Sequence, residues 1–506
     1  MIAEDILFDA YNPYAIQLTD KEISNIQTNS RLIEDGDLFV AIKGHTVDGH
    51  QFIEQAIQQG AHFVLADKTF LKTADSKSFL HKKILFVENT YAYLSTLMNR
   101  FLDSPSQKMN IFGITGTNGK TSTAHILTQI LSKTGQKTAV LGTTGIRTDN
   151  YSAPMNNTTP DPLVLQNVFQ QMVDLDVENM IMEVSSIGLA EERTKETDFS
   201  VAIFTNFSQD HLDFHGTMEN YLKAKGKFFK ELEPYNHRGQ ENFAIINRDD
   251  ATADYFIEQS RATVLTYGLD QTADYYASDI SYSDFSTSFM LHYQNEVYPV
   301  QSSLIGKFNV YNLLAAIAAA HSQGIPLTDI VNNLMTLNSV EGRFEVVSDT
   351  TKDDITVIVD FAHTPDSLEK TLQTLAHIKH HRIISVFGCG GDRDASKRPI
   401  MAEIGVTNSD YVVFTSDNPR TEDPKQILDE MTNTLSEENY CQIINRKEAI
   451  HHAINLAEKN DIVLIAGKGH EDYQIIGTEK FPFDDRICAK EALELRNKKK
   501  HTKMYL

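Results

Sequence analysis

An apolar strand, a glycine-rich turn and a helix follow one another in "NIFGITGTNGKTSTAHIL", near residue 115 of this 506-residue chain. Glycines let backbone N–H groups approach phosphate oxygens, and the start of a helix adds partial positive charge. Lys120 would reach the β- and γ-phosphates of a nucleotide, and Thr121 would hold Mg²⁺. Ile114 replaces the first glycine of the usual nucleotide-binding pattern. The segment predicts ATP binding by Gly116, Thr117, Asn118, Gly119, Lys120, Thr121 and Ser122.

A carboxylate and an imidazole follow two further strands. Glu183 ends the strand in "IMEVSSIGL", and His211 follows the next strand in "FTNFSQDHLDFHGTMENY". Ligands of open α/β sheets bind beyond the carboxyl ends of the strands, beside the phosphate loop. The pair therefore suits a divalent ion that bridges ATP to a second substrate. Taken alone, His211 could also be a hydrogen-bonded surface histidine.

Amides and guanidinium groups form a third set of candidates. Asn309 and Asn312 begin a helix three residues apart and so lie on one face, where they could read an adenine edge or a ribose. Helix capping by Asn309 is the competing interpretation. In the last third of the chain, several charged side chains lie at or near strand ends, which is more than surface charge explains; they are Arg343, Arg393, Arg420, Asp360, His363 and Glu471.

Strands and helices alternate through most of the chain, which predicts an α/β protein with mainly parallel sheets. Strands are expected at 110–115, 138–143, 179–184, 201–205, 243–247, 355–360, 382–387, 411–415 and 461–466, and a helix at 309–322. Residues 262–303 are expected to form an antiparallel insertion, and 103–106 a linker. Three domains follow: a small N-terminal α/β domain (1–106), a central P-loop-type domain (107–337) and a C-terminal Rossmann-like domain (338–506).

Composition narrows the class of protein. The 46 Lys and Arg against 69 Asp and Glu give a net charge of −23, which argues against a nucleic-acid partner. Three scattered cysteines cannot build a disulfide framework or a zinc site. The acidic N-terminus is unlike a secretory signal, and the apolar run 313–320 is too short to span a bilayer. We therefore expect a cytoplasmic protein without membrane insertion.

The motifs together resemble the Mur ligase family along the whole chain. The resemblance rests on "TNSRLIEDGDLFVAIKGHTVDGHQFIEQA", the phosphate loop, "NNTTPD", "DHLDFHGTMENY", "EGRFE" and "DNPR". It implies an ATP-dependent amide ligase of peptidoglycan precursor synthesis, acting as a monomer with Mg²⁺. ATP would phosphorylate the free carboxylate of UDP-MurNAc-L-Ala-D-Glu, and an amino acid's amine would then displace phosphate. A carboxylate is a poor electrophile, and phosphorylation gives it a leaving group.

The same resemblance implies residue roles. Lys225 in "YLKAK" matches the lysine that the family converts to N6-carboxylysine. The implied catalytic residues are Lys120, Lys225, His211 and Glu183, with Thr121, Glu183, His211 and Lys225 around the metal. Asn309, Arg343 and Asp360 would hold the nucleotide. The UDP-muramoyl peptide would contact Ser30, Asn157, Thr158, Thr159, Ser185, Glu191 and Arg193. The amino acid would contact Arg393, Asp417, Asn418, Pro419, Arg420, Gly467 and Glu471.

The predicted amino acid is meso-diaminopimelate, which differs from lysine by a distal carboxylate. Arg420 in "DNPR" can pair with that carboxylate, Arg393 can assist, and Glu471 in "GKGHED" can accept a hydrogen bond from the distal ammonium. With L-lysine bound, the arginines would lack their partner. In resembling enzymes that use lysine, the arginine of "DNPR" and the glutamate of "GHE" are typically replaced.

Two positions depart from the family pattern. Ile187 stands where the family usually has histidine, and Glu191 where it usually has glutamine. A carboxylate beside an anionic substrate is unfavourable unless it is protonated or turned away. The alternatives are an L-lysine-adding or divergent ligase, a folylpolyglutamate synthetase-like ligase, and a non-catalytic nucleotide-sensing homologue. A folylpolyglutamate synthetase has no reason to carry the N-terminal domain or "DNPR". The presence of Lys120, Glu183, His211 and Lys225 argues against a non-catalytic homologue.

Overall fold

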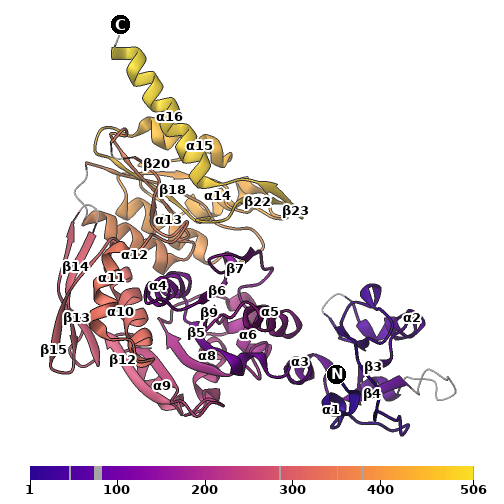
Figure 1. Cartoon of the computed structure of the whole chain (residues 1–506). Coiled ribbons are helices and arrows are strands. Elements are labelled where there is room, and N and C mark those ends of the chain that lie inside the picture. The colour runs from indigo at the N-terminus through magenta and orange to yellow at the C-terminus, as the bar shows by residue number, and fades with distance from the viewer. Residues whose placement is uncertain (45–46, 73–82, 284–285, 350, 378–380, 505–506) are drawn as a thin grey trace. The chain divides into compact units, whose positions relative to one another are not determined.

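The computed structural model describes residues 1–44, 47–72, 83–283, 286–349, 351–377 and 381–504 (Figure 1). These residues form two compact units. The first consists of Met1–Gly113, Lys137–Ser200 and Glu233–Asn242. The second consists of Ile114–Gln136, Val201–Leu232 and Phe243–Leu506.

The first unit begins with a small parallel sheet. Its strands are, in order, β1 (Ile26–Gln27), β2 (Leu38–Val40), β3 (Phe63–Asp67) and β4 (Ile84–Val87). Helices α1 (Ala3–Leu7), α2 (Ile53–Gln58) and α3 (Thr90–Phe101) accompany them. Every residue of β2 and β4 is buried, as expected of parallel strands that are covered on both faces.

The first unit also contains part of the largest sheet. Its elements here are β6 (Thr138–Gly142), β7 (Gly145–Arg147), β8 (Ser152–Ala153), α5 (Pro162–Asp174), β9 (Asn179–Glu183) and α6 (Ser186–Ala190). Strand β6 pairs in parallel with β9 and antiparallel with β7. Asp161 caps α5 through its side chain, and Ser185 caps α6 in the same way.

The second unit contains the other part of that sheet. Its strands are β5 (Asn110–Thr115) and β10 (Phe199–Phe204), which both begin in the first unit, β11 (Phe243–Asn247), β12 (Thr263–Gly268), β13 (Tyr275–Ser283), β14 (Ser286–Tyr293) and β15 (Glu296–Ser302). Its helices are α4 (Lys120–Lys133), α7 (Leu212–His215), α8 (Met218–Glu231), α9 (Ala253–Gln259), α10 (Lys307–Ser322) and α11 (Leu327–Asn333). Within the described residues the strand order is β15-β14-β13-β12-β11-β10-β5-β9-β6-β7-β8.

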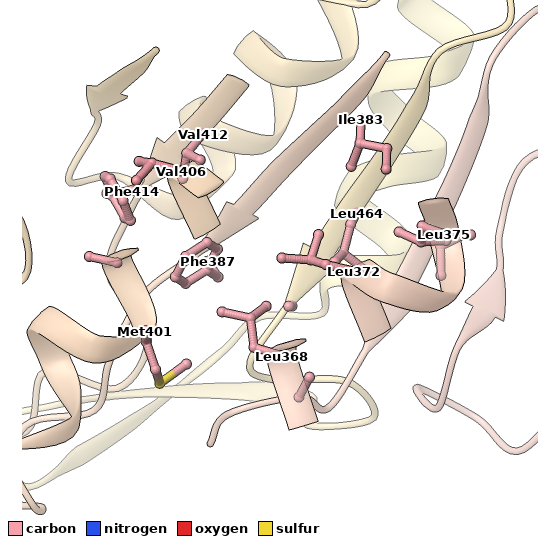
Figure 2. Close-up of a cluster of buried hydrophobic side chains, with 14 of the residues drawn as sticks. Leu368, Leu372, Leu375, Ile383, Phe387, Met401, Val406, Val412, Phe414 and Leu464 are labelled. Atoms are coloured by element: carbon pink, nitrogen blue, oxygen red, sulfur yellow. The ribbon is translucent and has the colours of Figure 1, made fainter. Parts of the chain in front are cut away.

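The C-terminal sheet has the order β16-β17-β21-β18-β19-β20 and is parallel apart from β16. Its strands are β16 (Glu345–Val346), β17 (Thr356–Asp360), β18 (Ile383–Phe387), β19 (Tyr411–Phe414), β20 (Tyr440–Gln442) and β21 (Ile462–Ala466). Helices α12 (Pro365–Ala376), α13 (Lys397–Asn408) and α14 (Pro424–Thr432) contribute to one core cluster, part of which Figure 2 shows. Helices α15 (Arg446–Leu456) and α16 (Asp485–Met504) contribute to the other. A hairpin, β22 (Tyr473–Ile476) and β23 (Glu479–Pro482), precedes α16.

The predicted α/β class, the mainly parallel central sheet and the nine predicted strands are confirmed. The predicted antiparallel insertion at 262–303 is confirmed for β13, β14 and β15, but β12 pairs in parallel with β11 and with the start of β13. The predicted linker, 103–106, ends at a buried residue: Ser106 is 0% exposed, and its Oγ donates to Glu196 O and accepts from Asp198 N. The domain limits at residues 106 and 337 stay predictions.

Within the described ranges, no helix combines the length and the apolar character that crossing a bilayer requires.

Candidate active site

The phosphate loop joins β5 to α4 and needs glycine at two positions. Gly116 has φ +145°, and a Cβ there would lie 1.9 Å from Thr205 Oγ1. Gly119 precedes α4 with φ +86°, and its Cβ would lie 2.6 Å from Asn312 Oδ1. The loop therefore brings its backbone N–H groups to the start of a 14-residue helix, which is the geometry of an anion site.

Two lysines converge on the carbonyl oxygen of Gly116. Lys120 Nζ donates to it at 2.9 Å, and Lys225 Nζ, from α8, donates to it at 2.8 Å. Lys225 is 1% exposed, and its Nζ lies 4.6 Å from the centre of the Tyr221 ring. Burial, reinforced by the charge of Lys120, lowers the pKa of Lys225 well below its ordinary value. Because CO₂ reacts with the neutral amine, this environment favours carbamylation.

His211 stands at the start of α7 in a left-handed conformation, with φ +53°. Its Nε2 lies 3.4 Å from Asp210 Oδ2. Burial lowers the pKa of His211, which favours the neutral imidazole that a metal ligand requires. Asp210, which sequence reasoning missed, interacts electrostatically with His363 and Lys397 of the C-terminal sheet region. Its place next to His211 in the sequence was the available signal.

The described residues hold no cluster of three or more His, Cys, Asp or Glu side chains with metal-binding geometry. Three of the four predicted metal ligands, Thr121, His211 and Lys225, belong to the second unit. Thr121 Oγ1 accepts a hydrogen bond from Arg343 Nη2 at 3.0 Å. Glu183 belongs to the first unit.

A cavity of about 410 Å³ adjoins the phosphate loop within the second unit. Six of the predicted nucleotide contacts line it: Asn118, Gly119, Ser122, Asn309, Arg343 and Asp360. Tyr282, Tyr311 and His377 also line it and were not predicted. The Tyr282 and His377 rings stack with centres 6.1 Å apart. The cavity thus offers aromatic surface and amides, as a base and a ribose require.

The asparagine pair lies on one face of α10, as predicted. Asn312 Nδ2 donates to Asn309 Oδ1 at 3.2 Å, and Asn309 Nδ2 donates to Ile305 O at 2.9 Å. The helix begins after Gly306 without a side-chain cap, so the capping interpretation of Asn309 is wrong. Thr123 Oγ1, from α4, donates to Asn312 Oδ1 at 3.2 Å. This bond ties the asparagine pair to the helix that carries the phosphate loop.

Arg343 and Asp360 lie in the same part of the cavity. The Arg343 guanidinium lies 4.2 Å from the centre of the Phe361 ring, besides its bond to Thr121. The Asp360 carboxylate accepts from Phe344 N at 2.6 Å and from Ala362 N at 2.7 Å. Burial raises the pKa of Asp360. Asp360 therefore fixes the loop after Arg343 as well as facing the cavity.

The residues predicted to hold the UDP-muramoyl peptide all belong to the first unit; they are Ser30, Asn157, Thr158, Thr159, Ser185, Glu191 and Arg193. Thr159 Oγ1 donates to Glu183 O at 3.0 Å and accepts from Ser185 N at 2.9 Å. Arg193 Nη1 donates to Thr159 O at 2.8 Å. Asn157 is exposed, whereas Ser30 is buried, with its Oγ 3.4 Å from Gln55 Oε1. The structure thus joins Thr159, Ser185 and Arg193.

Glu191 is turned toward Arg193. Its Oε2 accepts from Arg193 Nε at 2.9 Å and from Nη2 at 2.6 Å. Glu191, which stands where the family usually has glutamine, is therefore already paired with Arg193, a residue predicted to bind the anionic substrate. In the first unit, Glu183 is buried and its Oε1 accepts from Thr143 N at 3.0 Å and from Thr143 Oγ1 at 3.2 Å. Ile187 is half-buried in α6.

The loops that follow β18, β19 and β21 carry the predicted amino-acid site. Arg420 has φ +51°, and its Nη1 donates to Gly391 O at 2.9 Å. A Cβ on Gly390 would lie 3.0 Å from Arg420 Nη1 and 3.8 Å from Arg393 Cγ, so the two arginines flank this glycine. Burial, followed by the charge of Arg393, lowers the pKa of Arg420. The structure thus brings the two predicted arginines together beside one glycine.

The other side chains of this site form a hydrogen-bonded group. Asn418 Nδ2 donates to Glu471 Oε2 at 3.0 Å. Lys468 Nζ donates to the same oxygen at 2.8 Å. Asp417 Oδ2 lies close to Gly467, where a Cβ would approach it to 2.7 Å. Sequence reasoning missed Lys468, and its position between two glycines in "GKGHED" was the only signal.

Family models identify the class of protein to which this fold and site belong. The models described as "Mur ligase family, catalytic domain", "Mur ligase middle domain" and "Mur ligase, glutamate ligase domain" match residues 22–102, 114–320 and 342–469. The chain belongs to the Mur ligase family.

Particular relatives are similar over almost the whole chain. A protein of Bacillus cereus named UDP-N-acetylmuramoyl-L-alanyl-D-glutamate–2,6-diaminopimelate ligase is 46% identical over 473 residues, 93% of this chain and 94% of the relative. A solved structure with that name is 34% identical with a TM-score of 0.67, covering 95% and 96% of the two chains. A folylpolyglutamate synthase of Mycobacterium tuberculosis is 18% identical with a TM-score of 0.63, covering 74% and 92%, which shows a shared fold alone.

Proposed function

We propose that this chain is an ATP-dependent ligase that adds meso-diaminopimelate to UDP-MurNAc-L-Ala-D-Glu in peptidoglycan precursor synthesis. One observation carries the proposal: a single compact unit holds a phosphate loop contacted by Lys120 and Lys225, a nucleotide-sized cavity beside it, and the neighbouring arginines Arg393 and Arg420. The relatives named as diaminopimelate ligases support the same substrates. A folylpolyglutamate synthetase-like activity has only a likeness of fold in its favour.

The reaction has two steps. A carboxylate oxygen of the D-glutamyl residue attacks the γ-phosphorus of ATP, the bond to the β–γ bridging oxygen breaks, and ADP leaves. The amine of diaminopimelate then attacks the carbonyl carbon of the acyl phosphate, loses a proton as the amide forms, and displaces inorganic phosphate. Phosphoryl transfer needs positioning and charge neutralisation more than covalent help, and the start of α4 and Lys120 supply both.

Mg²⁺ and Lys225 would act in the first step, the transfer of the phosphoryl group. Bound Mg²⁺ would neutralise charge on the phosphates, with Thr121, Glu183, His211 and carbamylated Lys225 as its protein ligands or their supports. The burial of Lys225 and its lowered pKa support carbamylation. The hydrogen bond from the unmodified Lys225 Nζ to Gly116 O supports a role for this side chain beside the phosphate loop.

The remaining assignments complete the proposal. The UDP-muramoyl peptide binds the first unit through Thr159, Ser185 and Arg193, with the uridine end toward Ser30. The enzyme acts as a cytoplasmic monomer, in which residues 1–106, 107–337 and 338–506 act as nucleotide-sugar, ATP and amino-acid domains.

The amino acid is selected by charge. The arginine pair takes the distal carboxylate of meso-diaminopimelate, and Glu471 accepts a hydrogen bond from its distal ammonium. L-Lysine lacks the carboxylate and would leave the half-buried Arg420 and its exposed neighbour Arg393 without that partner.

The test is phosphate release from ATP and UDP-MurNAc-L-Ala-D-Glu with each amino acid in turn. We expect turnover with meso-diaminopimelate, and a kcat/KM for L-lysine lower by on the order of a thousandfold. Arg420→Ala should reduce that preference, because one cation of the pair is lost. Comparable kcat/KM values for the two diamino acids would refute the proposed choice. No phosphate release with any amino acid would favour the nucleotide-sensing alternative.

A further inference from the structure

Lys468 is a buried cation inside the predicted amino-acid site. Its side chain is 0% exposed. Its Nζ donates to Asn418 Oδ1 at 3.0 Å and to Glu471 Oε2 at 2.8 Å, and it lies 5.5 Å from the centre of the Tyr473 ring. A buried ammonium is costly unless it is paired and hydrogen-bonded, and Glu471 and Asn418 meet both needs.

Two hydrogen bonds to the Glu471 carboxylate reach the same oxygen atom. Both Lys468 and Asn418 donate to Oε2, and Oε1 makes no hydrogen bond within the part of the chain that the structure describes. The Glu471 side chain is 20% exposed, so the carboxylate is held from the protein side and can meet a ligand on the other. Asn418 is itself fixed, because its Oδ1 also accepts from Ile475 N at 2.9 Å.

The backbone around Lys468 is also constrained. Gly467 and Gly469 have φ values of +113° and +52°. A Cβ on Gly469 would lie 2.4 Å from Gly342 O. Glu471 N donates to Lys468 O at 2.9 Å, which closes a turn that brings the two side chains together. The Lys468–Glu471 pair is therefore built into the loop after β21.

We propose that Lys468 is a positioning residue for the diamino acid: it holds Glu471 by Oε2 so that Oε1 faces the distal ammonium. This inference rests on the proposed function, because it assigns the ligand of Glu471. Lys468 does not touch the substrate. It balances the charge of Glu471 before binding and fixes one rotamer, so less ordering is needed when the diamino acid arrives.

The test compares Lys468→Met with a matched control, Lys480→Met. Lys480 Nζ lies 4.2 Å from the centre of the same Tyr473 ring, but Lys480 is exposed on β23 and does not contact Glu471. In Lys468→Met we expect the KM for meso-diaminopimelate to rise about tenfold, with the KM values for ATP and UDP-MurNAc-L-Ala-D-Glu changed by less than about twofold. Lys480→Met should leave all three unchanged. An unchanged KM for meso-diaminopimelate in Lys468→Met, or an equal rise in all three, would overturn the proposal.

A double-mutant comparison keeps the test decisive if Lys468→Met folds poorly. Lys468→Met/Glu471→Gln removes both charges of the pair together and is compared with Glu471→Gln alone. If Lys468 acts through Glu471, the two proteins have the same KM for meso-diaminopimelate. A further rise of about tenfold in the double variant shows an independent effect and contradicts the proposal. Failure of the wild-type protein to use meso-diaminopimelate refutes the proposed function, whereas wild-type turnover with unaffected variants refutes this inference only.

Discussion

At the scale of single residues, neighbouring charges decide what each predicted site residue can do. Arg193 forms an ion pair with Glu191, whereas burial and, after it, the charge of Arg393 lower the pKa of Arg420. Lys225 is buried near another lysine, which favours its neutral form. The same residue types thus have different chemistry according to their partners.

The variant Lys225→Ala tests whether ligase activity depends on a carbamylated Lys225. In Lys225→Ala we expect ligase activity to be lost, because the anionic group beside the phosphate loop cannot form. Added short carboxylic acids should partly restore activity by supplying a carboxylate to the space that the side chain leaves. Since the pKa of Lys225 is lowered, the CO₂-dependent activity of the wild-type protein should extend to lower pH than an ordinary lysine would allow. A turnover number of Lys225→Ala equal to that of the wild-type protein would contradict the proposed role of Lys225.

Glu191 offers a test in the opposite direction. In Glu191→Gln the charge of Arg193 is no longer balanced by its nearest carboxylate, so an anionic substrate gains attraction. We expect the KM for UDP-MurNAc-L-Ala-D-Glu to fall about fivefold, with the KM for ATP unchanged. Glu192→Gln, at the adjacent and more exposed glutamate, is the control. A raised KM in Glu191→Gln would show that the ion pair instead holds Arg193 in its binding position.

At the scale of elements, the site is built at the carboxyl ends of buried strands. Strands β5, β19 and β21 lead directly into the phosphate loop, "DNPR" and "GKGHED". Glycines with positive φ make the first turn after β5 and after β21, at Gly116 and Gly467. The buried strands therefore hold the first residues of each functional loop in position.

Replacement of Gly119 tests whether the phosphate loop needs glycine for the close approach of Asn312 or only for its positive φ. Gly119→Ala should weaken ATP binding on the order of a hundredfold, because its Cβ displaces the Asn312 side chain or the loop. Gly135, with φ +85° against +86° for Gly119, has no neighbour within 4 Å of a Cβ. Gly135→Ala should cost about 1 kcal/mol of stability and leave ATP affinity intact. Equal ATP affinities in the two variants, measured by calorimetry, would count against the assigned loop.

A buried ion pair links the elements behind the amino-acid site. Arg446 of α15 and Asp485 of α16 are both 0% exposed and lie 2.7 Å apart. Arg446 also donates to Ser416 O and Ala466 O, at the ends of β19 and β21. Arg446→Met should lower the free energy of unfolding by about 4 kcal/mol, because Asp485 is left buried without its partner.

The next residue on α15 is the control for this change. Lys447 pairs with Glu491 of α16 at the same 2.7 Å, but both side chains are about half-exposed. Lys447→Met should change the free energy of unfolding by less than about 0.5 kcal/mol in urea titrations. Similar losses in the two variants would mean that burial does not distinguish the pairs.

Sequence patterns predicted the strands that are buried on both faces with their limits, and the half-exposed strands β13, β14 and β15 only as one antiparallel segment. β10 and β18 are wholly buried runs of mainly apolar residues, which stand out in the sequence. The hairpin β22–β23 has no such pattern, because β22 is mostly half-buried and β23 is exposed. The parallel pairing of β12 and the burial of Ser106 depend on contacts far apart in the chain. The phosphate loop was predictable because its chemistry is local, whereas the pairing of Lys468 with Glu471 and Asn418 depends on two loops that meet only in the fold.

At the scale of the whole molecule, the predicted substrate contacts are segregated. All those for the UDP-muramoyl peptide belong to the first unit, whereas those for ATP and the amino acid belong to the second. The affinity for each ligand can therefore be changed within one unit without altering the residues assigned to the others. The proposed reaction uses all three ligands in one turnover.

The fate of one oxygen atom tests the central claim most directly. If the D-glutamyl carboxylate is phosphorylated by ATP and then captured by meso-diaminopimelate, a carboxylate labelled with ¹⁸O at both oxygens must lose one of them to inorganic phosphate. Mass spectrometry of the released phosphate should find one ¹⁸O atom for each amide formed. Unlabelled phosphate accompanying amide formation would contradict the acyl phosphate and the account built on it.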